Sequence, residues 1–429
     1  MAEPTDPLRL STLPPVGGMR LVRQSAPAGA GSFSATYVGP AGWGHDPSGA
    51  EGAARLVAQL AVCAAGPYDR VELARRLDRA GATLSSQVAP ESAELSVWGP
   101  ADAWEELVGL LALAVLNPRF DADDVRRARR QLAERQLREA SQPAQRAERE
   151  LLRASFPEGH PYGGTGIGTA RSLARLGRPT LARFHREHFT ADGGLLVVTG
   201  PRGPAVERLA RRLFGALPST SAPPLRTELR SRAPGGRRTL NLPGRSQVEV
   251  RVGGPSIPRR DPRFAAAFLA NEVLGGRPLL SRLFQRLREH GGLAYHAGSE
   301  LEAMRFGGYW MAGAGTGADR WRKVVPMLEQ ELERLRDAAP GAAELDLVRE
   351  SAIGELPLSL ESTSDAHELA VDAAYHGLPD DHWLRWPATL RAVRPAELRD
   401  AARAAFGSAG SVTVVAGPVG SGAAGRRAT

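Results

Sequence analysis

The sequence predicts an α+β protein built from two homologous domains. The same order of strands and helices runs twice along the 429 residues. Two Gly-Pro landmarks recur at nearly one spacing: Gly39 and Gly254 lie 254 − 39 = 215 apart, and Gly200 and Gly417 lie 417 − 200 = 217 apart. A chain of this length exceeds one ordinary core. Because self-similarity at a fixed offset indicates duplication, we expect two copies of one domain.

In the first half, the alternation of small and apolar residues at 31–40 ("GSFSATYVGP") is typical of a half-buried strand. The Arg/Glu-rich stretch 126–153 is typical of a helix whose solvated face carries i,i+4 ion pairs. The other expected elements are helices at 48–65, 70–81 and 101–116, strands at 82–89, 92–99 and 194–201, and a glycine-rich loop at 156–169.

The same order begins again after a stretch without apolar periodicity. That stretch, 217–238, is rich in Pro, Ser and Arg, and such composition favours a linker. We therefore predict an N-terminal domain at 1–216 and a C-terminal domain at 239–429. In the second half we expect strands at 246–255, 293–303, 307–315 and 411–418, and helices at 261–276 and 278–292.

Composition limits the class of protein. A hydrophobic share of 42% and a charged share of 24% are those of a soluble globular protein. No apolar run approaches the roughly 20 residues that span a bilayer, and the first residues lack a secretory pattern. We therefore expect a cytoplasmic protein with no membrane partner. The single cysteine, Cys63, excludes intramolecular disulfides and cysteine-rich metal sites.

The net charge of +8 raises the question of a nucleic-acid partner. Arginine carries nearly all of the positive charge, since Lys323 is the only lysine. The arginines are scattered among glutamates and form no basic stripe with interleaved aromatic residues, which single strands need for base stacking. We expect no nucleic-acid partner, and a basic nucleic-acid-binding protein is the weakest of the alternatives.

Histidine motifs suggest no metal site by themselves. Neither H-E-x-x-H nor H-x-x-E-H occurs in the chain. In "RLREHGGLAY" (286–295) Glu289-His290 would end the inverted motif, but Arg286 stands where its first histidine should be. His185 and His188 of "HREH" lie one helical turn apart; without a C-x-x-C they do not make a deaminase site, and an ordinary pair on a helix surface is the simpler interpretation.

Several segments in this order and spacing resemble the insulinase/pitrilysin-type (inverzincin) metallopeptidase family, in its mitochondrial processing peptidase branch. They are "LDRAGATLSSQVAPESAELSVWG", "NPRFDADDVRRARRQL", "HPYGGTGIGT", "LARFHREHFTADGGLLVVTGP", "NEVLGGRPLLSRLFQRLREHGGLAYHAGSE" and "VTVVAGP". The resemblance implies two homologous domains per chain, each an antiparallel-rich sheet with helices packed on one face. It also implies that two chains enclose a chamber for peptide.

The family's zinc helix corresponds to "GAARLVAQL" (52–60). On that alignment Arg55 and Gln59 replace the two histidines of H-x-x-E-H, Ala58 replaces the general-base glutamate, and the third ligand falls near Glu134. Zinc needs three or four N, S or O ligands, and an arginine repels a cation. Without a carboxylate at 58 nothing takes the proton of an attacking water. We expect no metal and no catalytic residue in this chain alone.

The family's second-half pattern, an arginine and a tyrosine seven residues apart in L-R-x-x-x-G-L-x-Y, matches Arg288 and Tyr295. The resemblance gives this pair the task of binding substrate backbone and stabilising the oxyanion. A guanidinium with several fixed donors and a phenol suit that task. The alternative is a surface arginine and a half-buried strand tyrosine, each ordinary alone.

Together these features predict the non-catalytic subunit of a heterodimeric zinc endopeptidase. Its partner would be a homologous catalytic subunit that carries H-x-x-E-H and the zinc, and its substrate an extended peptide or leader peptide, partly bound as an added strand. The scarcity of lysine suggests a high-GC bacterial source. The principal alternative is a structural subunit of the same fold, of the kind found in the core of respiratory complexes, without proteolytic function.

Overall fold

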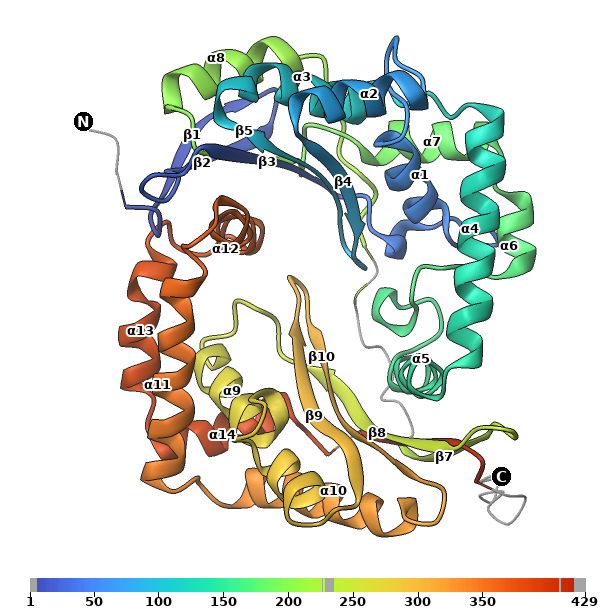
Figure 1. Ribbon diagram of the computed structural model, residues 1–429, viewed down its shortest axis with the longest axis vertical. Helices are drawn as coiled ribbons and strands as arrows, with labels where there is room; N and C mark the ends of the chain where they lie inside the picture. Colours follow the sequence, from blue (N-terminus) through green and yellow to red (C-terminus); the bar gives the residue numbers. More distant parts are fainter. Residues whose placement is uncertain (1–5, 226, 228–234, 409, 420–429) are drawn as a thin grey trace. The chain divides into compact units, whose positions relative to one another are not determined.

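A computed structural model describes residues 6–225, 227, 235–408 and 410–419 (Figure 1). These residues form two compact units. The first contains the chain up to Gln136, Thr165–Arg226 and Glu355–Trp386, and the second contains Leu137–Gly164, Thr227–Gly354 and the chain from Pro387 on. Each unit has one sheet.

The first unit has a six-stranded sheet in the order β1-β2-β6-β3-β5-β4. Its strands are β1 (Leu10–Val16), β2 (Met19–Gln24), β3 (Ser32–Gly39), β4 (Thr83–Val88), β5 (Ala93–Pro100) and β6 (Leu195–Thr199). All neighbouring strands are antiparallel except β2 and β6, which are parallel. The strands expected at 31–40, 82–89, 92–99 and 194–201 are present, whereas β1 and β2 were not predicted.

Helices of the first half cover one face of this sheet, seen at the top of Figure 1. They are α1 (Ala53–Ala61), α2 (Arg70–Ala80), α3 (Trp104–Leu116) and α8 (Gly203–Phe214). Two further helices of this half are α6 (Ala170–Arg175) and α7 (Arg178–His188), and α7 packs against α1. Helices α1, α3 and α8 contact the strands directly. Alternate residues of β3, Phe33, Ala35 and Tyr37, point into the core on this side and are fully buried.

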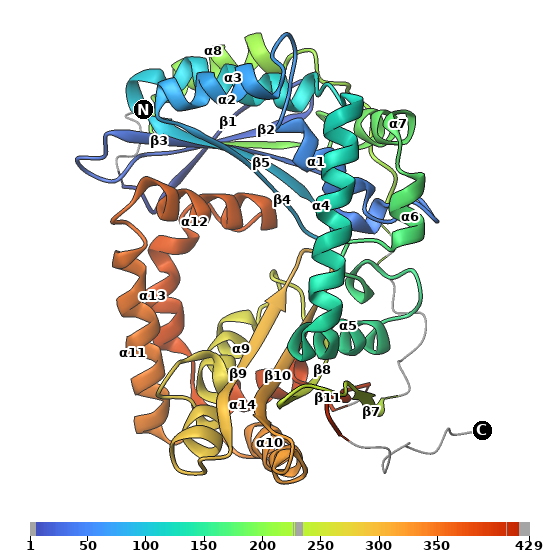
Figure 2. The ribbon, with the colours of Figure 1, turned by 45° about the vertical axis from the view of Figure 1, so that its right-hand side comes forward.

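The opposite face of the same sheet is also apolar at its centre, because alternate strand residues point to opposite sides. Val22, Val38 and Val197 lie there and pack against Ala370 and Ala373 of α12 (Thr363–His376). This helix comes from the second half of the sequence and contacts β2, β3 and β6. Figures 1 and 2 both show α12 on the side of the sheet opposite α3 and α8.

The second unit repeats this arrangement with a five-stranded sheet in the order β7-β11-β8-β10-β9. Its strands are β7 (Gly236–Asn241), β8 (Gln247–Ser256), β9 (Ala294–Ala303), β10 (Gly308–Gly317) and β11 (Val412–Gly417). Helices α9 (Phe264–Asn271), α10 (Trp321–Asp337) and α14 (Pro395–Ala405) lie at one face, where Trp310 contacts Phe406. On the other face α5 (Pro143–Ser155) packs against β8 and β11.

Each unit therefore takes one helix from the other half of the sequence. Helix α5 begins at Pro143 and α12 at Thr363, 363 − 143 = 220 residues apart and close to the offset of the Gly-Pro landmarks. Leu151 of α5 lies so close to β8 that a Cβ added to Gly253 would be 3.0 Å from it. The boundary between sequence repeats predicted at 217–238 stays a prediction, and each compact unit draws on segments from both sides of it. Residues 226 and 228–234 of that linker lie outside the described residues, and β7 begins at its end, at Gly236.

The remaining helices are α4 (Ala122–Ser141), α11 (Ala342–Leu358) and α13 (His382–Ala392), with π-helical turns η4 (Glu272–Gly276) and η5 (Phe284–Glu289). The helical region expected at 126–153 contains two helices, because Pro143 starts a new helix at its first turn. The α+β class with two sheets is confirmed. In the described part of the chain, none of the helices has the length and apolar character needed to cross a bilayer.

A chain of buried polar contacts ties α12 to the first sheet. The Nε2 atom of His367 lies 2.8 Å from the hydroxyl of Thr36 on β3, and its Nδ1 atom lies 2.8 Å from the hydroxyl of Thr199 on β6. Thr199 in turn donates to Oε1 of Gln24 at 2.7 Å. Complete burial lowers the pKa of His367 from 6.5 to about 3, so the ring is neutral in the folded protein at neutral pH.

This burial predicts an acid-sensitive fold. Below pH 6.5 the histidine side chain is protonated in the unfolded chain. In the folded protein His367 stays neutral in this range, because its pKa is lowered to about 3. The free energy of unfolding should therefore fall with decreasing pH in this window, by up to about 1.4 kcal/mol per pH unit from this group. His367→Gln should remove that part of the slope in urea titrations between pH 4.5 and 7.5. Equal slopes for wild type and His367→Gln would contradict the assignment.

Candidate functional site

Helix α1 carries the three residues predicted to stand at the positions of a zinc motif. Its N-terminus is fixed by Asp46, whose carboxylate accepts from the backbone N–H groups of Gly52 at 2.7 Å and Ala54 at 2.8 Å. Burial raises the pKa of Asp46 to about 7. Most of the helix is buried, while Arg55 and Gln59, four residues apart, share its partly exposed face.

Arg55 is held by two contacts of its guanidinium. Its Nε and Nη2 atoms donate to the carbonyl of Thr165 at 3.2 and 2.9 Å. The same guanidinium lies 4.9 Å from the ring centroid of Trp43, a cation–π contact. Where a histidine ligand would be required, the chain therefore holds a fixed positive charge.

Ala58 and Gln59 complete the change in donor chemistry. Ala58 is fully buried and offers only a methyl group. The side-chain amide of Gln59 donates to Oε1 of Gln131 on α4 at 2.9 Å, so a neutral hydrogen bond links the two helices. Glu134, the expected place of a third ligand, is exposed one turn further along α4. A guanidinium, a methyl group and two amides do not fit zinc, which prefers thiolate, imidazole and carboxylate ligands.

The rest of the described chain offers no substitute: it contains no group of three His, Cys, Asp or Glu side chains placed to hold a metal ion.

The "HREH" histidines belong to the core of the first unit, and their surface placement was the wrong expectation. His185 bonds the carbonyl of Val115 at 2.8 Å, and burial lowers its pKa to about 4. His188 is buried against Phe184 and His45, with ring centroids 4.4 and 4.7 Å apart.

Arg288 and Tyr295 flank one tight turn in the second unit. Arg288 lies in the last turn of η5, is exposed, and places its guanidinium 5.0 Å from the ring of Phe284. Tyr295 is the second residue of β9 and is 60% exposed, which is unusual for a residue of its size. Between them Gly292 adopts φ +55°, a left-handed conformation that glycine favours.

The turn itself is fixed by backbone contacts. The N–H of Gly292 donates to the carbonyl of Arg288 at 3.1 Å, and the N–H of Leu293 donates to the carbonyl of Leu287 at 2.9 Å. Arg320 donates to the carbonyl of Gly292 at 2.8 Å. These hydrogen bonds fix the backbone from which the exposed side chains of Arg288 and Tyr295 project. Strand β9, which carries Tyr295, is an edge strand of its sheet.

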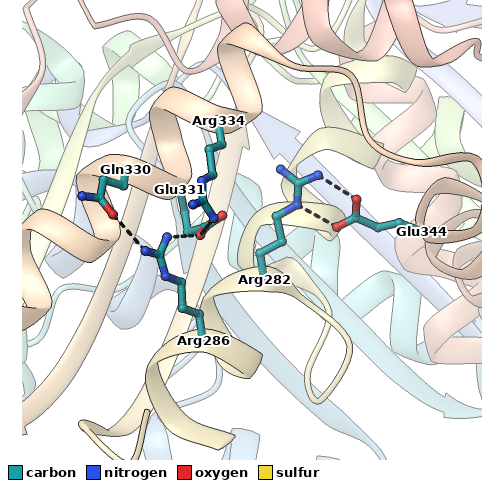
Figure 3. A network of polar contacts seen from close by, with 6 residues as sticks. All are labelled: Arg282, Arg286, Gln330, Glu331, Arg334 and Glu344. Atoms are coloured by element: carbon teal, nitrogen blue, oxygen red, sulfur yellow. Dashed lines mark hydrogen bonds and ion pairs between the residues drawn. The ribbon is translucent and has the colours of Figure 1, made fainter. Parts of the chain in front are cut away.

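An ion-pair network anchors the helix that leads to Arg288 (Figure 3). Arg282 forms a bidentate ion pair with Glu344, in which each hydrogen bond is 2.7 Å long. Arg286 donates to the carboxylate of Glu331, which is only 3% exposed. The same carboxylate also accepts from Arg334 at 3.1 Å. The arginine that occupies the first position of the broken H-x-x-E-H pattern, Arg286, is therefore a packing residue that holds η5 against α10.

Two family descriptions match the chain in succession. Residues 21–169 match "Insulinase (Peptidase family M16)", and residues 175–352 match "Peptidase M16 inactive domain". The two matches together span most of the 429 residues. The chain belongs to the insulinase family, M16, of metallopeptidases. Within that family it lacks the H-x-x-E-H motif.

Proteins with similar sequences are also named as zinc proteases. The chain is 28% identical to an "uncharacterized zinc protease" of Mycobacterium tuberculosis over 370 residues, which cover 84% of this chain and 83% of the relative. It is 26% identical over 215 residues to one from Bacillus subtilis, with 50% and 52% of the two chains covered.

Solved structures agree on the fold. An M16 inactive domain from Pseudomonas fluorescens superimposes with a TM-score of 0.88 at 22% identity over 95% of this chain and 98% of that one. A protease from Helicobacter pylori superimposes with a TM-score of 0.84 at 17% identity, covering 95% and 99%. At these identities the likeness concerns the fold of the insulinase family.

The residues missed from the sequence are the partners of Arg55 and Gln59. Thr165 and Trp43 hold Arg55, and Gln131 holds Gln59. The one signal that could have indicated Gln131 is its place on α4, one turn before Glu134. The contact of Arg55 with Thr165 joins residues 110 apart, and no local pattern announces it.

The network in Figure 3 predicts a large and specific loss of stability. Glu331→Ala leaves Arg286 and Arg334 without their shared buried carboxylate and should lower the free energy of unfolding by roughly 2–3 kcal/mol. Glu350→Ala is the matched control, because its pair with Arg391 is more than half exposed on both sides, and its loss of stability should be much smaller than that of Glu331→Ala. Denaturant titration measures both, and similar losses would show that the buried network has no special role.

Proposed function

We propose that this chain is the non-catalytic subunit of a two-chain zinc endopeptidase. One observation carries the proposal: the positions of the zinc helix are closed by internal hydrogen bonds, while Arg288 and Tyr295 stand exposed beside an edge strand. The partner is a homologous chain with an intact H-x-x-E-H motif, and it brings the zinc. Alone, this chain is inactive.

The role proposed for Arg288 and Tyr295 follows from their chemistry. A guanidinium donates several hydrogen bonds in a fixed fork, which suits the carbonyl groups of a peptide backbone. A phenol donates one hydrogen bond and can stabilise an oxyanion that develops on a carbonyl under attack at the partner's zinc. Because β9 lies at the edge of its sheet, an extended peptide can pair with it as an added strand.

The substrate proposed is an extended peptide, such as the leader segment of a precursor, processed in the cytoplasm of a bacterium. The family name supports peptide hydrolysis as the reaction class, and the relatives named as zinc proteases are bacterial. A structural subunit of the same fold would need neither an exposed Arg288 nor an exposed Tyr295.

A reconstitution experiment tests the division of labour. The chain alone, a same-family partner with H-x-x-E-H alone, and the two mixed are assayed with a quenched fluorescent peptide, with and without a chelator. We expect chelator-sensitive cleavage only in the mixture, and less than stoichiometric zinc in the purified chain by elemental analysis. Zinc-dependent cleavage by this chain alone would refute the proposal, and an inactive mixture would favour the structural alternative.

A second prediction concerns the two site residues. Arg288→Ala combined with Tyr295→Phe should lower kcat/KM of the mixture by roughly 100-fold, the scale on which the loss of an oxyanion donor acts. The matched control is Arg305→Ala with Phe306→Leu, which removes an exposed cation and an exposed aromatic ring from the turn between β9 and β10. This control should keep its activity within about twofold. Equal activities of both double variants and wild type would remove Arg288 and Tyr295 from the site.

A further inference from the structure

The first sheet has a polar strip on the face that α12 covers. Along β5, Ala93, Leu95 and Val97 point into the core, so Glu94, Ser96 and Trp98 point to the opposite face. Ser34 and Thr36 of β3 point the same way, by the same alternation. These polar residues continue the face on which Val22, Val38 and Val197 pack under α12.

A hollow lies between this strip and the polar side of α12, wholly inside the first unit. Strand β4 contributes Ser85 and Gln87, and α12 contributes Glu368, Asp372 and His376. Trp98, 42% exposed, forms part of the wall. The hollow arises because the apolar part of α12 covers only the inner strands and leaves the outer strands β5 and β4 open beside it.

The hollow is lined by anionic groups and hydroxyls. Glu94, Glu368 and Asp372 line it, and among the described residues that line it none is a lysine or an arginine. Burial and the neighbouring Glu368 raise the pKa of Glu94. His376 lies 3.7 Å from Asp372, and His367 is already engaged by two threonine hydroxyls. A positive group placed here would relieve the repulsion between Glu94 and Glu368.

Ser34 gives a second and independent indication of a ligand. It lines the hollow and is only 3% exposed. Its hydroxyl has no hydrogen-bond partner within the described part of the chain. Buried hydroxyls without a partner are rare, because each costs free energy. An N–H donor that enters the hollow would supply the missing partner.

We propose that this hollow binds an organic cation, an ammonium or guanidinium group, between Glu94, Glu368 and the ring of Trp98. The carboxylates would accept its N–H donors in charge-assisted hydrogen bonds, and the indole would face the cation. Ser34 would accept a further N–H. An exposed tryptophan and scattered hydroxyls suit a multidonor organic cation better than a metal ion, and no three-residue metal cluster occurs among the described residues.

The source of the group is either a free amine or the side chain of an arginine or lysine in a peptide. The site belongs to this chain alone, so it does not depend on the zinc partner. Its test and the reconstitution test above can therefore fail separately.

Binding is tested by calorimetry on the full chain without any partner. The probes are agmatine, a blocked peptide with one arginine, and the same peptide with neutral citrulline in its place. Binding of both cationic probes supports a site that recognises the guanidinium group itself, whichever molecule carries it. Binding of the peptide alone, or of agmatine alone, supports the proposal and assigns the source. No preference of any cationic probe over citrulline would overturn it, and so would equal binding of Mg²⁺.

Variants locate the site. Glu94→Gln and Glu368→Gln should each weaken binding about tenfold, the usual effect of losing one charge-assisted hydrogen bond. Ser34→Ala should weaken it about threefold. Glu148→Gln is the matched control, because Glu148 is a half-buried glutamate of the second unit whose pKa burial also raises. Glu368 is exposed, so its variant keeps the test open if Glu94→Gln does not fold. A loss in Glu148→Gln equal to that in Glu368→Gln would place the cation elsewhere.

Discussion

The structure depends on the burial of each sheet on both of its faces. The central strands are apolar on alternate residues pointing both ways, as Leu195–Val198 of β6 shows. One face is covered by helices of the same half, but the other face would expose valines to water without α12. The equivalent helix, α5, does this for the second sheet through Ala147, Leu151 and Leu152. Exchange of one helix is thus the condition under which either sheet is stable.

This exchange also explains where polar side chains can gather. Ala370 and Ala373 of α12 match the apolar inner strands, whereas its charged side faces β5 and β4. His367 marks the border between the two regions, since its ring reaches β3 and β6 through threonine hydroxyls. One side of α12 therefore completes an apolar core, and its other side lines a polar hollow.

Local patterns in the sequence predicted most strands, because period-two alternation requires only neighbouring residues. They missed β1, where Pro14 and Pro15 interrupt the alternation and the pairing with β2 shifts register between Leu13 and Val16. They also joined α4 and α5, although Pro143 begins a new helix. The helix exchange was beyond such patterns, because a contact such as that of Gln24 with Ala366 joins residues 342 apart.

The candidate site shows the same division between local and distant information. Nine residues of sequence are enough to see that Arg55, Ala58 and Gln59 offer no zinc donors, but they do not reveal the contact partners of these side chains. The carbonyl of Thr165 accepts from Arg55, and the exposed amide of Gln131 accepts from Gln59. Histidines at 55 and 59 would leave both partners without those donors, and position 58 would still lack a carboxylate. Arg55 and Gln59 are therefore part of the packing between α1, α4 and the loop at Thr165, so these two side chains contribute to the local structure whatever the chemistry of the site.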